Sequence, residues 1–206
     1  MTIVKTCGKL YWAGEYAILE PGQLALIKAI PIYMMAEIKA SNNYRLYSDM
    51  FTYSVDMRPD SSYALIQETV ALVEEYLTAQ GVELQSFSLD IRGKMEREGK
   101  KFGLGSSGSV VVLVIKAMLA FYERLADREL LFKLASAVLL KRGDNGSMGD
   151  IACIVSEDLV LYQSFDREKV ADWLEKEDLQ AVLARDWGFS IRSVEPALKF
   201  DFLVGW

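Results

Sequence analysis

Apolar and polar positions alternate with two different periods along this chain, and the shorter period comes first. A period of two, or a short apolar run between turn residues, is typical of β-strands. Gly8, Gly14 and the turn Glu20-Pro21-Gly22 divide the N-terminal region into short pieces. We therefore expect strands at residues 3–6, 9–13, 17–19, 29–40 and 44–48.

A helical period appears from residue 61 onward. Residues 61–80 carry one apolar stripe, followed by Gly81 as a stop signal, and the stripe consists of Ile66, Val70, Val73 and Leu77. We expect further helices at residues 110–124, 127–140 and 168–184, and strands at 87–91, 151–155, 159–163 and 198–204. Strands first, then a strand–loop–helix unit and further helices, predict an α+β fold.

Composition places the chain among globular proteins and excludes several chemistries. Of its 206 residues, 51% are hydrophobic and 25% are charged, so it can bury a core. The net charge of −6 disfavours nonspecific nucleic-acid binding and requires a local positive pocket for any polyanionic substrate. The chain has no histidine, which excludes a serine–histidine triad and histidine-ligated zinc.

The cysteines and the apolar runs indicate the cellular compartment in which the protein is expected. Cys7 and Cys153 form no CxxC pair and lie far apart in sequence, which favours a reduced setting. The N-terminus has no signal-peptide pattern, and the longest apolar runs are too short for a bilayer. We expect a cytoplasmic protein that binds neither membranes nor nucleic acid.

A glycine-rich loop at residues 103–109 stands directly before the apolar run 110–121. Glycines let a backbone approach a ligand closely, and a helix N-terminus offers unpaired N–H groups and partial positive charge. The loop therefore suggests an anion site, whereas the simpler alternative is a glycine turn with a serine N-cap. The Walker and dinucleotide-binding spacings are both absent.

Two more segments resemble motifs found together with such a loop. Residues 7–22 read Cys-Gly-Lys-Leu-Tyr-Trp-Ala-Gly-Glu-Tyr-Ala-Ile-Leu-Glu-Pro-Gly, and residues 144–152 read Asp-Asn-Gly-Ser-Met-Gly-Asp-Ile-Ala. In this order the three segments resemble the GHMP small-molecule kinases, in particular the branch that phosphorylates 5-phosphomevalonate. The resemblance implies a fold like domain 2 of ribosomal protein S5, with a mixed sheet packed against helices.

The chain departs from the family pattern in four ways, the first being Lys100 and Lys101 before Phe102, where the family often has proline. Ser106-Ser107-Gly108-Ser109 replaces the usual Ser-Ser-Ala-Ala, and Met148 stands where glycine is common. A late glycine-rich loop of the family's C-terminal domain does not occur. We therefore expect residues 1–197 to form the GHMP-kinase N-terminal domain and residues 198–206 to begin a C-terminal domain that is largely missing. Apolar surface exposed in this way would promote self-association.

The resemblance also implies a set of site residues and the cofactors ATP and Mg²⁺. Lys9 and Asp150 match catalytic residues, and Ser107 matches the magnesium ligand. The nucleotide phosphates would be held by Gly103, Leu104, Gly105, Ser106, Ser107, Gly108 and Ser109. The acceptor would be contacted by Tyr16, Asn145, Ser147 and Arg142.

The chemistry of the acceptor qualifies the role of Asp150. A phosphate monoester has a second pKa of about 6 and is mostly deprotonated at neutral pH, so a general base has little to remove. We therefore expect Asp150 to orient the acceptor and Lys9, while Lys9 screens the repulsion between two anions. Two alternatives remain: another kinase of the family, acting on mevalonate or homoserine, and a ligand-binding fragment without turnover.

Overall fold

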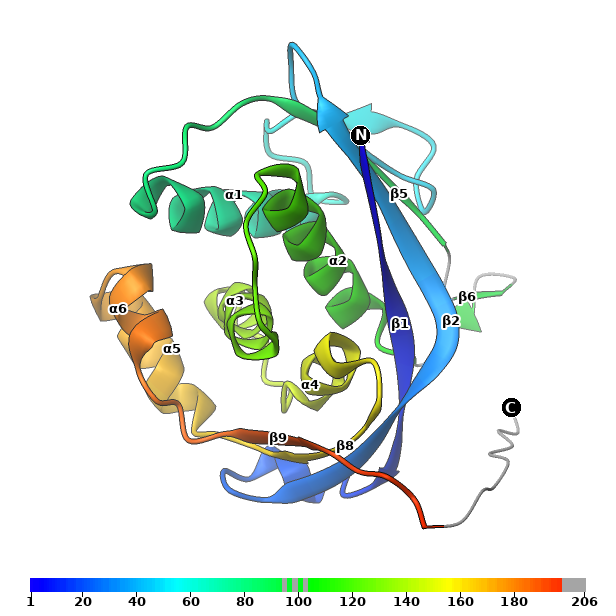
Figure 1. Cartoon of the computed structure of the whole chain (residues 1–206), viewed down its shortest axis with the longest axis vertical. Helices are drawn as coiled ribbons and strands as arrows, with labels where there is room; N and C mark the ends of the chain where they lie inside the picture. The colour runs from blue at the N-terminus through cyan, green and yellow to red at the C-terminus, as the bar shows by residue number, and fades with distance from the viewer. Residues whose placement is uncertain (94–95, 98–99, 102–103, 198–206) are drawn as a thin grey trace.

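The computed structural model describes residues 1–93, 96–97, 100–101 and 104–197. Figure 1 shows a long curved sheet with the helices gathered on its concave side. The predicted α+β class, a mixed sheet packed with helices, is confirmed. Residues 198–206, expected to begin a further domain, lie outside the described residues.

The sheet is built around one long strand, β2 (Leu24–Ala40), which pairs with three others. Antiparallel β1 (Thr2–Ala13) lies along one edge of it, while β5 (Phe87–Arg92) and β8 (Leu159–Gln163) pair with its two ends. The strand order is β4 (Ser54–Val55), β3 (Arg45–Ser48), β5, β2, β8 and β9 (Ser190–Ser193), and the β3–β5 pair is parallel. The described residues also form a separate two-stranded antiparallel sheet of β6 (Glu96–Arg97) and β7 (Lys100–Lys101).

The helical layer is organised around α2 (Ser106–Phe121), which packs on the sheet and on its neighbouring helices. Almost every α2 residue from Gly108 to Leu119 is buried, as expected for a helix that is apolar on all sides. The other helices are α1 (Ala64–Ala79), α3 (Arg128–Lys141), α4 (Gly149–Ser156), α5 (Arg167–Lys176) and α6 (Leu179–Ala184). The helices predicted at 61–80, 110–124 and 127–140 are thus confirmed, with their ends shifted.

The pairing of β1 with β2 changes register between Cys7 and Gly8. Before this point Thr6 faces the helices, since its hydroxyl donates to the carbonyl of Ser109 in α2, 3.1 Å away. After it Lys9 and Tyr11 face them, as their contacts below show. The extra residues of this irregularity, Pro31 and Ile32, lie on β2, and on β1 the residues Thr6 and Lys9 on either side of it both approach α2.

Helix α2 is fastened to β1 at the same place. The Ser109 hydroxyl donates to the Cys7 carbonyl at 2.7 Å, and Thr6 donates back to the Ser109 carbonyl. Both side chains are fully buried. This exchange satisfies backbone carbonyls at a point where the β1–β2 ladder is irregular.

Three sequence predictions are corrected by the structure. Residues 17–19 form a short 3-10 helix rather than a strand, and residues 151–155 lie inside α4. The apolar run of α4 is buried against the sheet and other helices, and a short buried run has no period that separates strand from helix. The single helix predicted at 168–184 is two, because Asp178 caps a second helix by accepting from the Ala181 N–H.

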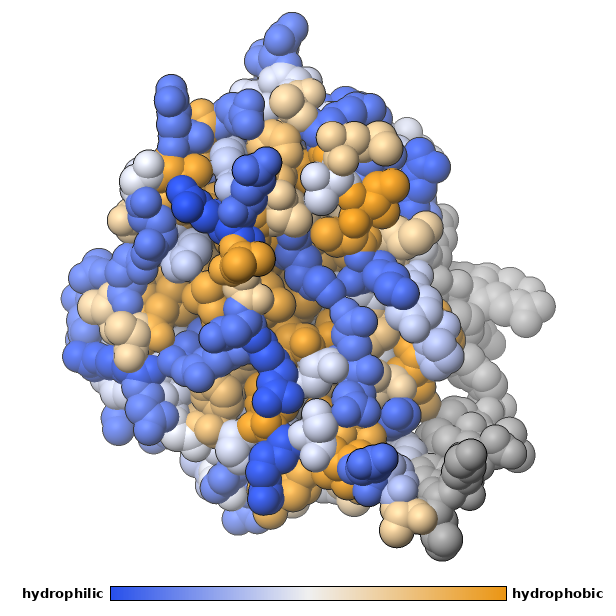
Figure 2. Space-filling model, in the orientation of Figure 1, coloured by the Kyte–Doolittle hydropathy of each residue, from blue (hydrophilic) through white to orange (hydrophobic). Residues whose placement is uncertain are grey.

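None of the described helices has the length and apolar character needed to cross a bilayer. Figure 2 shows the same face as Figure 1, with polar side chains spread over it and apolar groups visible between them. Between α6 and β9 the Asp186 carboxylate accepts from the Gly188 N–H, and Trp187 is buried.

We predict that Ser109→Ala lowers the free energy of unfolding by about 1–3 kcal/mol, because the Cys7 carbonyl loses its buried donor. Chemical denaturation measures the change. The control is Ser193→Ala on the exposed part of β9, for which we expect a change within about 0.5 kcal/mol. Equal effects of the two substitutions would contradict the tie between α2 and β1.

Candidate functional site

Segments far apart in the sequence meet where β1 passes the beginnings of α2 and α4. A β-carbon built on Gly105 would lie 3.0 Å from Cε of Lys9 and 3.5 Å from Cβ of Asp150. One built on Gly108 would lie 2.9 Å from Oδ2 of Asp150. Lys9, the start of α2 and Asp150 therefore form one cluster, and the glycines leave the space that its two charged side chains occupy.

The backbone of the loop is anchored to β1. The N–H of Lys9 donates to the carbonyl of Leu104 at 3.0 Å, on the edge of β1 that faces away from β2. Gly105 then adopts a left-handed conformation with φ +78°, which L side chains rarely occupy. The first turn of α2 is thus held at a set distance from the Lys9 side chain.

Two helix N-termini converge on the cluster. The N-cap residues of α2 and α4 are Gly105 and Met148, both left-handed, and neither caps its helix through a side chain. In α4 the Gly149 and Ile151 N–H groups already donate to Ser147 and Asp150, so the first turn of α2 is the more open of the two. Backbone N–H groups of a first turn that receive no cap are donors for an anion, and the helix dipole adds partial positive charge. Met148 is a residue with a β-carbon at a conformation that suits glycine, and its side chain is buried in the core.

Asp150 sits in the first turn of α4 and is mostly removed from solvent. Burial raises the pKa of its carboxyl, and the nearby Lys9 ammonium and a hydrogen bond from the Ile151 N–H act in the opposite direction. Asp144 raises it further through charge repulsion. Desolvation therefore outweighs the attraction of Lys9, so the carboxylate is held at a cost in free energy.

Ser147, on the loop before α4, is tied to two tyrosines. Its hydroxyl lies 3.0 Å from the Tyr11 hydroxyl and accepts from the Gly149 N–H at 3.2 Å. Its carbonyl accepts from the buried Tyr162 hydroxyl at 2.9 Å. Tyr11 also lies under the Lys9 ammonium, 4.8 Å from its ring centroid. Sequence reasoning missed both tyrosines, although Tyr11 stands two positions after Lys9 in the first motif.

The other predicted nucleotide-binding residues divide into accessible and buried ones. Ser107 is exposed at the first turn of α2 and Ser106 is partly buried beside it, whereas Leu104 and Gly108 are buried. Ser109 is buried too, and its hydroxyl is bonded to Cys7. Gly103 lies outside the described residues.

Of the predicted acceptor-binding residues, Ser147 is the one whose hydrogen bonds, among the described residues, join it to the cluster. Tyr16 is 83% exposed at the start of the 3-10 helix, and Asn145 is exposed on the loop after α3. Arg142 ends α3, where its guanidinium forms an ion pair with Glu68 of α1. Their roles stay predictions.

The oxygen donors at the start of α2 fit a magnesium ion. Mg²⁺ prefers oxygen ligands, keeps several waters and is commonly bound by one or two protein groups together with substrate phosphates. Ser107 offers a hydroxyl, and the Asp150 carboxylate lies against the same turn at Gly108. Within the described ranges no three His, Cys, Asp or Glu side chains gather as a metal site, so a cage made of the protein alone does not form there.

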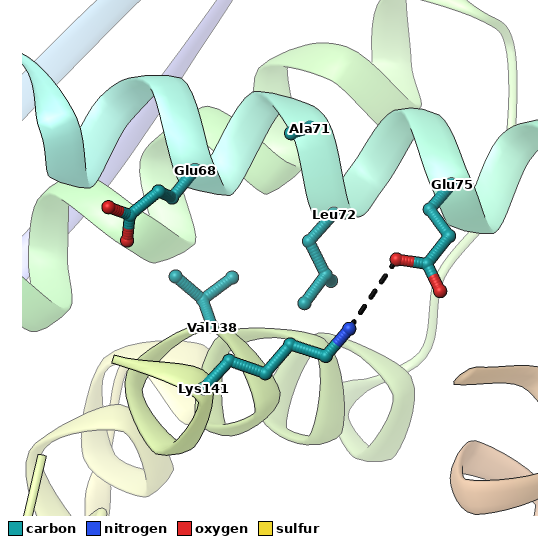
Figure 3. Close-up of a pocket in the computed structure, with 6 residues that line it drawn as sticks. All are labelled: Glu68, Ala71, Leu72, Glu75, Val138 and Lys141. Carbon is teal, nitrogen blue, oxygen red and sulfur yellow. Dashed lines mark ion pairs between the residues drawn. The ribbon is translucent and has the colours of Figure 1, made fainter. Parts of the chain in front are cut away.

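A groove of about 280 Å³ lies elsewhere, between α1 and α3. Figure 3 shows Lys141 of α3 reaching Glu75 of α1 across its end, with a Nζ–Oε2 distance of 3.5 Å. Its floor is apolar, and its lining residues are Glu68, Ala71, Leu72, Glu75, Val138 and Lys141. The groove shares no lining residue with the cluster around Lys9.

A protein-family model and a curated protein are similar in sequence to this chain. Residues 64–158 match the model of the GHMP kinases N terminal domain. A phosphomevalonate kinase from Streptomyces sp. (strain CL190) is 28% identical over 229 residues, which covers 100% of this chain and 61% of that protein. Both agree with the fold expected from the three motifs.

Solved structures of phosphomevalonate kinases match this chain with higher sequence identity. The Streptococcus pneumoniae phosphomevalonate kinase, in complex with phosphomevalonate and AMPPNP, is 72% identical with a TM-score of 0.95. The match covers 96% of this chain and 60% of that one, so this chain spans about three fifths of its length. The Methanococcus jannaschii mevalonate kinase, 22% identical with a TM-score of 0.66 over 79% of this chain and 53% of its own, shares the fold.

We predict that Asp150→Asn raises the free energy of unfolding at pH 7. Folding raises the pKa of this carboxyl, so the ionised form destabilises the folded state above that pKa. The cost disappears as the pH falls towards the unfolded value of about 3.9. The increase in the free energy of unfolding caused by Asp150→Asn should therefore become smaller between pH 7 and pH 4. Thermal unfolding at several pH values measures it.

Asp56→Asn is the control, and its effect on the free energy of unfolding should have the opposite sign. A hydrogen bond from the backbone N–H of Arg58 lowers the pKa of Asp56, so this substitution should lower stability at pH 7. The prediction for Asp150 fails if its substitution also destabilises the protein at pH 7.

Proposed function

We propose that this chain, which carries the N-terminal domain of the GHMP kinases, belongs to an ATP-dependent kinase that converts 5-phosphomevalonate to 5-diphosphomevalonate. This is a step of the mevalonate route to isoprenoids. The proposal rests on one observation above all: Lys9, Asp150 and the uncapped start of α2 form a single cluster. The 72% identical protein that was solved with phosphomevalonate and AMPPNP supports the choice of substrate.

The nucleotide side of the site is assigned to the start of α2. The N–H groups of the first turn and the hydroxyl of Ser106 would hold the phosphates of ATP, with the helix dipole favouring their negative charge. Gly105 and Gly108 allow this turn to approach Lys9 and Asp150 closely. The hydrogen bond from the Lys9 N–H to the Leu104 carbonyl holds this turn beside β1.

Magnesium would be held by the exposed Ser107 hydroxyl together with the phosphates. When bound, the ion supplies positive charge that neutralises the phosphate oxygens during transfer. The residues of the chain place the two substrates relative to one another.

In the transfer itself, an oxygen of the acceptor phosphate forms a bond to the γ-phosphorus of ATP, and the bond from that phosphorus to the bridging oxygen breaks, which releases ADP. The acceptor oxygen is already deprotonated at neutral pH, since the second pKa of a phosphate monoester is about 6. The main obstacle is therefore repulsion between anions, which the Lys9 ammonium reduces. Asp150, beside Lys9, orients that ammonium and the acceptor.

Acceptor binding is assigned to the loop before α4 and to the segment after β1. Ser147 contacts the cluster through Tyr11, and Asn145 and Tyr16 lie exposed on the two segments. Arg142 would have to leave its ion pair with Glu68 to reach a substrate. A mevalonate kinase shares the fold, and the substrate assay separates the two candidate activities.

We predict that the chain binds 5-phosphomevalonate more tightly than mevalonate and transfers phosphate from Mg-ATP to the phosphorylated acceptor alone. Calorimetry measures binding, and ³¹P NMR of prolonged reactions detects a diphosphate product even at low rates. Turnover of mevalonate alone would replace the proposal by the second kinase activity. Nucleotide binding without any product, even after long incubation, would leave a binding function only.

We predict that Lys9→Met lowers the rate of product formation by about 10²-fold or more, as expected for loss of a charge that stabilises transfer. Asp150→Asn should cost less, because it retains the side-chain shape and the acceptor needs no base. The ratio of the Asp150→Asn rate to the wild-type rate should stay constant from pH 5.5 to pH 8. Losses of equal size in both variants, with a ratio that follows acceptor protonation, would instead establish Asp150 as a general base.

A further inference from the structure

Tyr11 touches two members of the candidate site at once. The face of its ring lies 4.8 Å from the Lys9 ammonium, and its hydroxyl lies 3.0 Å from the hydroxyl of Ser147. Lys9 and Tyr11 project from the same side of β1 because they stand two residues apart after the register change. Tyr11 therefore joins β1 to the loop that carries Ser147 and leads into α4.

Hydrogen-bond capacity limits what the Ser147 hydroxyl can do. A serine hydroxyl has one proton to donate and two lone pairs that accept. The Gly149 N–H already donates to this oxygen at 3.2 Å. If Tyr11 donates as well, both lone pairs are engaged, and the Ser147 proton is left for an incoming oxygen.

The surroundings keep this arrangement in place. Tyr162 donates to the Ser147 carbonyl from a fully buried position. A β-carbon on Gly149 would collide with the Tyr11 hydroxyl, so the absence of a side chain there allows the approach of Tyr11 to Ser147. Burial also raises the pKa of Tyr11 to about 12, so its hydroxyl keeps its proton throughout the physiological range.

We propose that Tyr11 is a positioning residue: it donates to Ser147, and thereby directs the Ser147 proton towards a phosphate oxygen of the acceptor, while its ring supports the Lys9 ammonium. An anionic oxygen accepts hydrogen bonds and donates none, so acceptor binding selects this direction of the chain from Tyr11 to Ser147. The inference rests on the proposed kinase function and names how that site recognises a phosphate monoester.

Substitutions of Tyr11 separate the two contacts. Tyr11→Phe keeps the ring under Lys9 and removes the hydroxyl, so binding of 5-phosphomevalonate should weaken about tenfold while binding of Mg-ATP stays unchanged. Tyr11→Leu removes the ring too, and product formation at saturating substrates should then fall, which it does not in Tyr11→Phe. Calorimetry gives the affinities, and product formation gives the rates.

A double-mutant cycle tests whether Tyr11 acts through Ser147. In the Ser147→Ala background, Tyr11→Phe should produce no further loss of acceptor affinity, because the hydroxyl it would orient is absent. Tyr122→Phe is the matched control, since its hydroxyl bonds to backbone atoms of Gln85 beyond the far end of α2. This control should bind both ligands as the wild type does.

The outcomes are distinguishable. Selective loss of acceptor affinity together with a non-additive cycle supports the proposal. Unchanged acceptor affinity in Tyr11→Phe, additive losses in the cycle, or equal weakening of both ligands would overturn it while the kinase function stands. A wild-type protein that binds no 5-phosphomevalonate would overturn the proposed function, and this inference with it.

Discussion

The hydrogen-bonded attachment of α2 and its preceding loop to β1 is the constraint on which the candidate site depends. Between Cys7 and Gly8 the register changes, and beyond this point Lys9 and Tyr11 lie on the face that the helices cover. The Lys9 N–H donates to the Leu104 carbonyl just before α2, which sets the start of that helix beside the Lys9 side chain. Ser109 and Thr6 hold α2 at the same point, where the pairing of β1 with β2 shifts register.

The electrostatics of the site come from opposing contributions that the fold brings together. Two helix N-termini and Lys9 create positive potential in a chain whose net charge is −6. Asp150 is placed within this region, and its raised pKa records the cost of desolvation that Lys9 does not offset. A lysine beside a carboxylate whose ionised form destabilises the fold is typical of a functional site rather than of a stabilising ion pair.

The sequence predicted most of the regular elements and the cluster's main members. The stripe of α1 and the apolar run of α2 are long enough for period and length to identify helices. Residues 151–155 were misassigned because a short buried run satisfies both patterns, and residues 17–19 because three apolar residues have no period. Motifs identified Lys9, Asp150 and the loop before α2, whereas Tyr11 and Tyr162 carry no signal of their own in a chain with ten tyrosines.

By itself, then, the sequence determined most of the helices and strands, because their length and period are local properties, and its three motifs indicated a family by resemblance. The tertiary structure decided which side chains meet. The meeting of Tyr11 with Ser147 spans 136 positions of the chain, and that of Gly108 with Asp150 depends on how α2 and α4 pack. Contacts of this kind depend on strand register and on helix docking, which are set by the packing of the whole core rather than by any local pattern.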